Sequence, residues 1–234
     1  MVLKDKTRDK IIETYHKINY SDFMVVVKQL KNATKDCVSK DDFFTVKGEI
    51  GESVLECIIY EFIKINDLNN WYVYHGLIIG NESDFSTELD IILCTPSIIV
   101  VFEVKSWNGI KIVTDKGTIT IKDKYYFDVW KQNILHVEAL FNELQKCVKV
   151  KDSCMKTAMF NYSRGIVDDK RENEFKNIFP IYDETNITRF LSWIKKQEIV
   201  RWEIKKVNKI LDYMQECSKY MELSHLKYVK SIHS

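Results

Sequence analysis

The segment at residues 98–105, Ile-Ile-Val-Val-Phe-Glu-Val-Lys, constrains the fold of this chain most strongly. Its first five residues are apolar and mostly β-branched, which is typical of a central strand covered on both faces. The strand ends in Glu103 and Lys105, which are two residues apart and therefore lie on the same face. Charges beside such a buried run are costly unless they are paired or bound to a metal. The segment therefore predicts a sheet with charged side chains gathered at one end.

A second predicted strand, residues 88–93, brings Asp90 to the same end of the sheet. The two strands are joined by a tight Thr-Pro-Ser connection at residues 95–97. A compact turn there places Asp90 across from Glu103 or one step along the strand. Two carboxylates and the ammonium of Lys105 are then expected to converge at the mouth of the sheet.

These residue types suit phosphodiester hydrolysis. Carboxylate oxygens bind Mg²⁺ or Mn²⁺, often together with a backbone carbonyl and water. A bound divalent ion lowers the pKa of a water and offsets charge on the phosphate. Lys105 can orient or deprotonate that water. The same residues also fit a purely structural arrangement, in which Glu103 and Lys105 form an ion pair and Asp90 caps a turn. The three residues alone do not separate the two interpretations.

A predicted helix upstream, at residues 42–65, supplies a further carboxylate. Two of its residues, Gly48 and Gly51, each cost about 1 kcal/mol in a helix relative to alanine. Both lie on the apolar face, where they would let the helix backbone approach the sheet. Glu52 falls at the border of that face, and the acids at positions 49 and 56 are expected to point further outward. Glu52 is therefore either a site residue or a solvated first-turn acid that favours the helix dipole.

A predicted helix downstream, at residues 130–146, carries Gln132 and His136 on one face at i, i+4 spacing. A polar pair on the helix surface is the simpler explanation, and a contribution to the site is the alternative.

The order of elements predicts a mixed α/β sheet flanked by helices, with further helices at both ends. Two helices are expected within residues 3–36. We predict an N-terminal helical extension over residues 1–40, a nuclease-like domain over 41–170 and a C-terminal helical region over 171–234.

The C-terminal region contains a heptad pattern, formed by Val200, Ile204, Val207, Leu211, Met214 and Met221. Such a seam supports a homodimer through a coiled coil. The simpler alternative is a helix that packs on its own domain.

Composition excludes several classes of protein. The 234 residues carry a net charge of +1, so any nucleic-acid contact must come from a local patch. The first ten residues are charged throughout, which argues against a signal peptide and for a cytoplasmic protein. No CxxC pair, HxxxH pair or GxxxxGK[ST] loop is present, so zinc chemistry and ATP-driven activity are not expected.

Four strings together resemble the NERD (nuclease-related) domain, a branch of the PD-(D/E)XK nuclease superfamily. They are GEIGE at residues 48–52, ELD at 88–90, FEVKSWNG at 102–109, and the glutamine-bearing helix that follows. The resemblance covers about residues 46–145 and continues more weakly to about 165. It implies a restriction-endonuclease-like fold.

The resemblance also implies a role for each candidate residue. Asp90 and Glu103 would bind the divalent metal, and Lys105 would serve the attacking water. Glu52 would be the acidic residue of the first core helix, and Gln132 the polar residue of the following helix. The family usually has Asn-Pro a few residues before this glutamine, whereas here the preceding residues are Asp-Val-Trp-Lys.

The expected activity is therefore a metal-dependent nuclease acting on DNA, in mobile-element biology, plasmid maintenance or defence. Two alternatives are a nuclease fold that binds nucleic acid without cutting it, and a protein-interaction module that works through the C-terminal heptads.

Overall fold

The computed structural model describes residues 40–81, 85–107, 109–121, 125–162, 166–197 and 199–232. The two helices predicted within residues 3–36 lie outside the described residues. The elements are, in chain order, α3 (Lys40–Ile65), β1 (Tyr72–Asn81), β2 (Phe85–Cys94), β3 (Ile99–Lys105), β4 (Lys111–Thr114), β5 (Thr118–Ile121), β6 (Tyr125–Asp128), α4 (Val129–Gln145), the 3-10 turn η2 (Asp152–Cys154), β7 (Met155–Asn161), β8 (Val167–Asp169), α5 (Asn173–Ile178), β9 (Ile181–Tyr182), α6 (Ile187–Lys195) and α7 (Ile204–Ile232).

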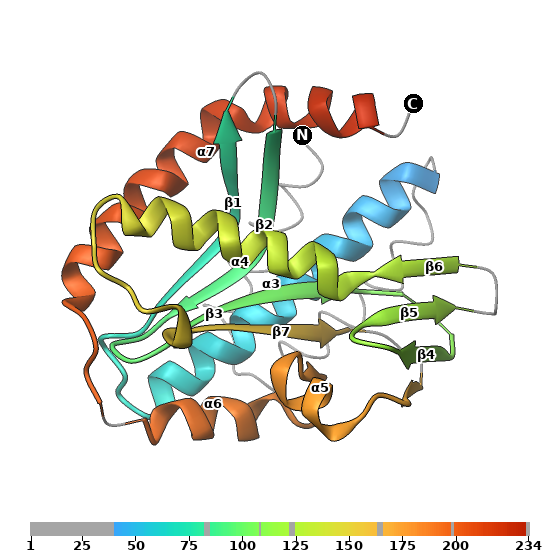
Figure 1. The fold of residues 1–234 in the computed structure, drawn as a ribbon, viewed down its shortest axis with the longest axis horizontal. Helices are drawn as coiled ribbons and strands as arrows, with labels where there is room; N and C mark the ends of the chain where they lie inside the picture. Colours follow the sequence, from blue (N-terminus) through green and yellow to red (C-terminus); the bar gives the residue numbers. More distant parts are fainter. Residues whose placement is uncertain are drawn as a thin grey trace.

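The centre of the molecule is a mixed five-stranded sheet in the order β1-β2-β3-β7-β9 (Figure 1). The first three strands are antiparallel neighbours, and β3, β7 and β9 run parallel. Helices α3 and α6 pack on one face, and α4 and α7 on the other. The predicted mixed α/β sheet flanked by helices is confirmed.

Strand β3 lies between the two helical layers, because its side chains alternate between them. Val100 and Phe102 contact the α3 and α6 side, whereas Ile99 and Val101 contact the α4 and α7 side. All four side chains are fully buried. Glu103 is the next residue on the side that faces α4, so its carboxylate lies in the layer that the helices cover.

The connection from β3 to β7 contains β4, β5, β6 and then α4. Together with β8, which follows β7 in the chain, the three strands form a second sheet in the order β6-β5-β4-β8. Parallel neighbours need such a crossover, since no tight turn can join them. The crossover lies at the end of β3 that carries the charged residues (Figure 1). The helix that returns to the sheet therefore begins beside these residues.

The middle of the heptad seam, from Ile204 to Met214, packs on the chain's own sheet. Val207 and Leu211 are fully buried against the β1 and β2 layer, and Tyr74 of β1 donates a hydrogen bond of 3.0 Å to Asp212. Val200 precedes α7 and is 72% exposed. These contacts favour the simpler alternative for this part of the seam, and the homodimer stays a prediction.

The central sheet continues past the predicted boundary at residue 170, because β9 pairs with β7. The C-terminal region therefore contributes a strand as well as helices. The five described cysteines are free thiols. Among the described helices, none combines the length and the apolar composition that crossing a lipid bilayer requires.

Candidate active site

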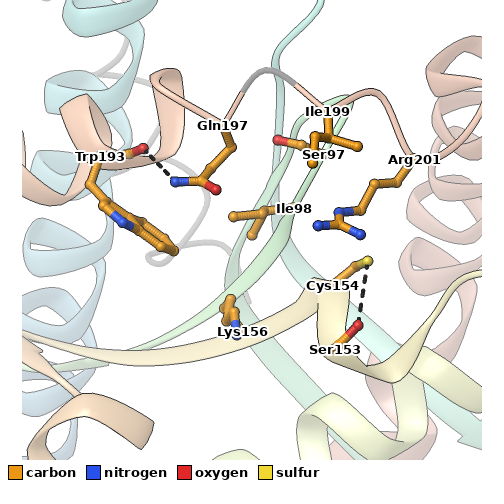
Figure 2. A pocket seen from close by; sticks show the side chains of 9 residues that line it. All are labelled: Ser97, Ile98, Ser153, Cys154, Lys156, Trp193, Gln197, Ile199 and Arg201. Carbon is orange, nitrogen blue, oxygen red and sulfur yellow. Dashed lines mark hydrogen bonds between the residues drawn. The ribbon is translucent and has the colours of Figure 1, made fainter.

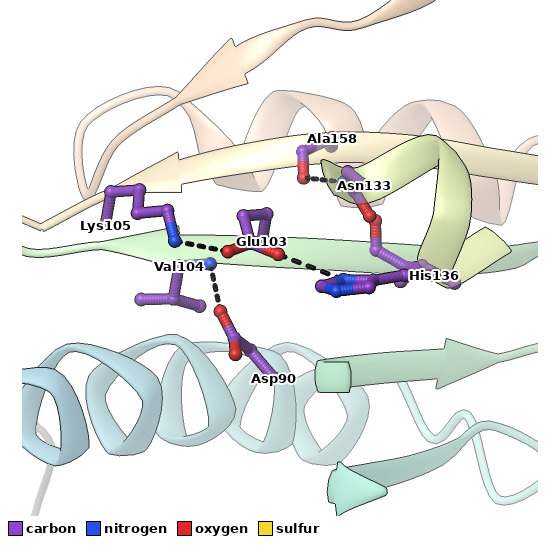
Figure 3. A network of polar contacts seen from close by, with 8 residues as sticks. Asp90, Glu103, Val104, Lys105, Asn133, His136 and Ala158 are labelled. Atoms are coloured by element: carbon purple, nitrogen blue, oxygen red, sulfur yellow. Dashed lines mark hydrogen bonds and ion pairs between the residues drawn. The ribbon is translucent and has the colours of Figure 1, made fainter. Parts of the chain in front are cut away.

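The β2–β3 hairpin determines where Asp90 lies. Thr95 closes the turn, since its hydroxyl accepts a hydrogen bond of 3.0 Å from the backbone N–H of Ile98. The last pair in the ladder is Ile91 with Phe102, so one further step places Asp90 opposite Glu103. The carboxylate of Asp90 accepts a hydrogen bond of 2.7 Å from the backbone N–H of Val104 (Figure 3). The turn predicted from the sequence thus brings the two carboxylates to one place.

Glu103 is the centre of a polar network and is only 1% exposed. One carboxylate oxygen accepts a hydrogen bond from the ammonium of Lys105. The other oxygen lies 3.1 Å from Nδ1 of His136, which is also buried (Figure 3). This second contact is close enough for an ion pair but is not aligned as a hydrogen bond. Glu103 Oε2 therefore keeps the capacity to bind a further partner.

Helix α4 contributes His136, one of the two polar candidates of this helix, and Asn133, which the sequence did not single out. Asn133 is fully buried and donates hydrogen bonds to the backbone carbonyls of Val101, at 3.4 Å, and Ala158, at 3.2 Å. It thereby ties the helix to β3 and β7, and His136 follows one turn later.

Gln132 is exposed and is not among the buried residues of α4. The buried face of α4 consists of Val129, Asn133, His136, Leu140 and Leu144. This spacing could have identified Asn133 from the sequence, because its position, like that of His136, is in phase with three apolar residues.

The charges in the network shift one another's pKa values. Burial, with the neighbouring Glu103, raises the pKa of the Asp90 carboxyl to about 7. Burial alone would also raise the pKa of Glu103, but Lys105 and His136 outweigh it and lower that pKa below its ordinary value. Burial lowers the pKa of Lys105, yet the carboxylates of Glu103, Asp90 and Glu52 together raise it. Glu103 is thus an ionised acid and Lys105 a cation, whereas burial and the charge of Glu103 outweigh the effect of Lys105 on the pKa of Asp90.

Helix α3 approaches the same end of β3 through Gly51. A Cβ added at Gly51 would lie 2.3 Å from Oγ of Ser106 and 3.2 Å from Cγ1 of Val104, so only glycine fits without movement. A Cβ at Gly48 meets no described atom within 4 Å, so the expected close approach holds for Gly51 alone.

The expected orientation of the neighbouring acids was wrong. Glu49 and Glu56 are each 2% exposed, whereas Glu52 is half-buried. The reason is that α3 is covered on more than its apolar face: the carboxylate of Glu56 lies 3.5 Å from Nδ1 of His75 in β1. Glu52 remains near the site, because its carboxylate contributes to the raised pKa of Lys105.

A comparison with known families bears on this arrangement directly. Residues 47–160 match the model of the nuclease-related domain, NERD. This region is a nuclease-related domain. It begins in α3, runs through the crossover and ends in β7, so it contains all of the polar network around Glu103. The suspected resemblance to NERD is confirmed. No curated protein matches the chain.

Trp107 forms one wall of the NERD site. Its ring lies 5.5 Å from the ammonium of Lys105 and stacks on Phe127 of β6 at 4.4 Å between ring centres. Gly109 follows with φ +98°, a conformation that glycine adopts without strain. The turn after β3 therefore holds an aromatic ring against the lysine.

The residues of the NERD site fit a divalent cation. Glu103 Oε2 is buried without an aligned hydrogen bond, and Asp90 is a second carboxylate that an added cation would stabilise. Among the described residues, no three His, Cys, Asp or Glu side chains gather to hold a metal by themselves. Such a site suits Mg²⁺ or Mn²⁺ better than Zn²⁺, since Mg²⁺ commonly uses one or two carboxylates and keeps several waters.

Proposed function

We propose that this NERD domain hydrolyses phosphodiester bonds in DNA with the help of Mg²⁺ or Mn²⁺. The observation that supports this most directly is the convergence of Asp90 and Glu103 beside Lys105 at the end of a buried strand. Buried carboxylates that face each other destabilise a fold unless a cation offsets them. Lys105 carries only one positive charge for the two carboxylates, so a bound divalent cation would stabilise the pair further.

In this proposal, Asp90 and Glu103 hold the divalent ion. When bound, the ion supplies Lewis-acid charge that activates water and offsets the charge on the scissile phosphate. Lys105 is a cation in this environment, so it acts as a hydrogen-bond donor to the attacking water and the phosphate. It is poorly suited to accept a proton. The side chain of Lys105 is 17% exposed, whereas that of Glu103 is 1% exposed, so a substrate would approach from the lysine side.

His136 and Glu52 have supporting roles in the proposal. His136 holds Glu103 Oε2 from the α4 side and so orients the carboxylate. Glu52 adds negative charge near Lys105 and favours its charged form. A role in mobile-element biology, plasmid maintenance or defence against foreign DNA is supported by analogy with the family alone.

The test is a cleavage assay on supercoiled plasmid, single-stranded DNA and RNA, with Mg²⁺ or Mn²⁺. Wild type is compared with Asp90→Ala and Lys105→Ala, and Lys146→Ala, at an exposed position on α4, is the matched lysine control. We expect metal-dependent cutting of DNA that the first two substitutions abolish and the control leaves intact.

A folded wild type that cuts neither DNA nor RNA with either metal contradicts the proposal. Binding of DNA without cutting would instead support the second candidate function, a nucleic-acid-binding module. The exposed position of Gln132 favours that second function, because the residue of α4 that contacts Glu103 is His136 and not the glutamine that the family implies.

A further inference from the structure

A cavity of about 160 Å³ opens at the end of the sheet opposite the NERD site (Figure 2). Its floor is formed by Ile98, just before β3, and Lys156, near the start of β7. Its rim includes Gln197, Ile199 and Arg201, which lie between α6 and α7. Ile98 and Glu103 are five positions apart in the chain, which corresponds to about 17 Å of strand at ~3.3 Å per residue. The cavity and the polar network around Glu103 are therefore separate sites.

Two cations line the cavity. Lys156 is the one exposed position in β7, in which the other six residues are buried. Arg201 is anchored by its backbone N–H, which donates a hydrogen bond of 3.0 Å to the carbonyl of Pro96 in the β2–β3 turn. Figure 2 shows the guanidinium of Arg201 beside Ile98, facing the hollow. The described residues that line the cavity include no carboxylate. The chemistry of the lining therefore favours an anion.

An aromatic wall stands on the other side of the cavity. Trp193 is 45% exposed, and its ring stacks on Phe190 with 5.7 Å between centres and 10° between planes. Phe190 in turn stacks on Tyr182 at 4.6 Å. The stack holds the indole in place. A planar ligand group that binds to the exposed part of the indole therefore does not have to immobilise a mobile side chain, which would cost binding free energy.

Hydroxyl and amide groups complete the lining. Ser97 and Ser153 are hydroxyl donors, and Gln197 donates a hydrogen bond of 3.2 Å to the backbone carbonyl of Trp193, so its side-chain oxygen faces outward as an acceptor. The volume corresponds to about five water molecules at ~30 Å³ each. It accommodates a phosphate group but is smaller than the ~300–1,000 Å³ typical of sites that enclose a whole ligand.

We propose that this cavity binds the phosphate group of a nucleotide between Lys156 and Arg201, with the base stacked on Trp193 at the rim. Basic groups next to an aromatic platform are the usual means of binding nucleotides without regard to sequence. The nucleotide is either free or the end of a strand, since both present the same phosphate and base. The proposal does not depend on cleavage at the NERD site.

The test is calorimetric titration of the full chain with adenosine 5′-monophosphate, inorganic phosphate and a 5′-phosphorylated oligonucleotide. The oligonucleotide is titrated into Asp90→Ala, so that it is not consumed. We expect the nucleotide to bind, and Lys156→Gln and Arg201→Gln each to weaken it about tenfold, as for the loss of one charge-assisted hydrogen bond. Trp193→Leu should weaken the binding of the nucleotide but not the binding of inorganic phosphate.

Lys209→Gln, at an exposed position of α7, is the matched control and should bind like wild type. Unchanged melting temperatures show that the variants are folded. Binding of the oligonucleotide alone, weakened by Arg201→Gln, supports the cavity as a site for strand ends. Failure of both nucleotide and oligonucleotide to bind overturns the proposal, as does wild-type affinity in Lys156→Gln and Arg201→Gln. Wild-type affinity in Trp193→Leu overturns the stacking of the base.

Discussion

Asp90 of β2 accepts a 2.7 Å hydrogen bond from the backbone N–H of Val104, the residue between Glu103 and Lys105 in β3. This bond continues the β2–β3 pairing one step past its last ladder pair through a side chain instead of the backbone. Asp90 therefore has two separable properties: its charge, which serves the proposed metal, and its acceptor oxygen, which fixes the end of β3.

Two substitutions separate these properties. Asp90→Asn keeps an acceptor for the Val104 N–H and removes a charge that faces Glu103, so we expect unchanged or higher stability with cleavage abolished. Asp90→Ala leaves the N–H without its partner and should lower the free energy of unfolding by about 1–3 kcal/mol. Urea unfolding and DNA cleavage measured on both variants test this. Equal stability of the two variants would show that the hydrogen bond does not hold the strand.

The contribution of α4 to the site can be assigned by comparing His136→Ala with Gln132→Ala. His136 contacts the Glu103 carboxylate, whereas Gln132 is exposed. Loss of an outer residue that orients a metal ligand typically costs about 10–100-fold in activity or metal affinity. We expect His136→Ala to lose this much activity or Mg²⁺ affinity, and Gln132→Ala to lose none. The measurement is the rate of cleavage as a function of Mg²⁺ concentration. The reverse result would restore the assignment made from the sequence.

The two glycines of α3 should respond oppositely to alanine. Gly51→Ala places a methyl group against Ser106 and Val104, so it should destabilise the protein by about 1–3 kcal/mol despite the gain in helix propensity. Gly48→Ala meets no described atom and should stabilise the protein by up to about 1 kcal/mol. Thermal unfolding of the two variants gives the comparison, and equal stability would exclude a close approach at Gly51.

Arg171 holds three segments together. Its buried guanidinium donates two hydrogen bonds to the carboxylate of Asp169, at 2.9 and 2.8 Å, and others to the carbonyls of Lys116 and Phe179, at 3.0 and 2.8 Å. Arg171→Met leaves these acceptors without their donor, and we expect a loss of about 3–5 kcal/mol in unfolding free energy. Lys170 is exposed and pairs with Asp168, so Lys170→Met should lower the free energy of unfolding by less than about 1 kcal/mol.

Lys111 gives the protein a pH dependence of known sign. Burial, with nearby Lys47, lowers the pKa of its ammonium to about 8, whereas an unfolded chain has a lysine pKa of about 10.4. Between about pH 8 and 10 the unfolded state binds more protons, so this lysine makes stability rise with pH in that window. Urea unfolding of wild type and Lys111→Met at both ends of the window measures the contribution. The advantage of the variant should shrink as pH rises, and a constant difference would contradict the lowered pKa.

The sequence predicted the middle of the central sheet, because β2 and β3 are long and strongly apolar. The run before Glu103 and the short connection at residues 95–97 were sufficient to place β3 and its neighbour, and through them Asp90. Strands β6, β8 and β9 span only two to four residues each and were not predicted. Such short strands are specified by what they pair with, which a local pattern does not contain.

The parts of the site that come from helices were harder to predict. The rotation of a helix about its axis determines which polar residues face the sheet, and a difference of one residue turns a side chain by about 100°. That difference separates exposed Gln132 from buried Asn133. In α3, the burial of Glu49 and Glu56 arises from layers of the fold that only the tertiary structure reveals.

The crossover between β3 and β7 also determines when the site can form. Asp90 and Glu103 meet through a local hairpin, whereas His136 reaches Glu103 only once α4, which follows β4, β5 and β6 in the chain, has docked on β3 and β7. Contacts that close a long loop form late in folding, because closing the loop costs conformational entropy. A chain still emerging from the ribosome would therefore present its two acids before the histidine that orients them. The site would become fully competent for the proposed hydrolysis only when the fold is complete.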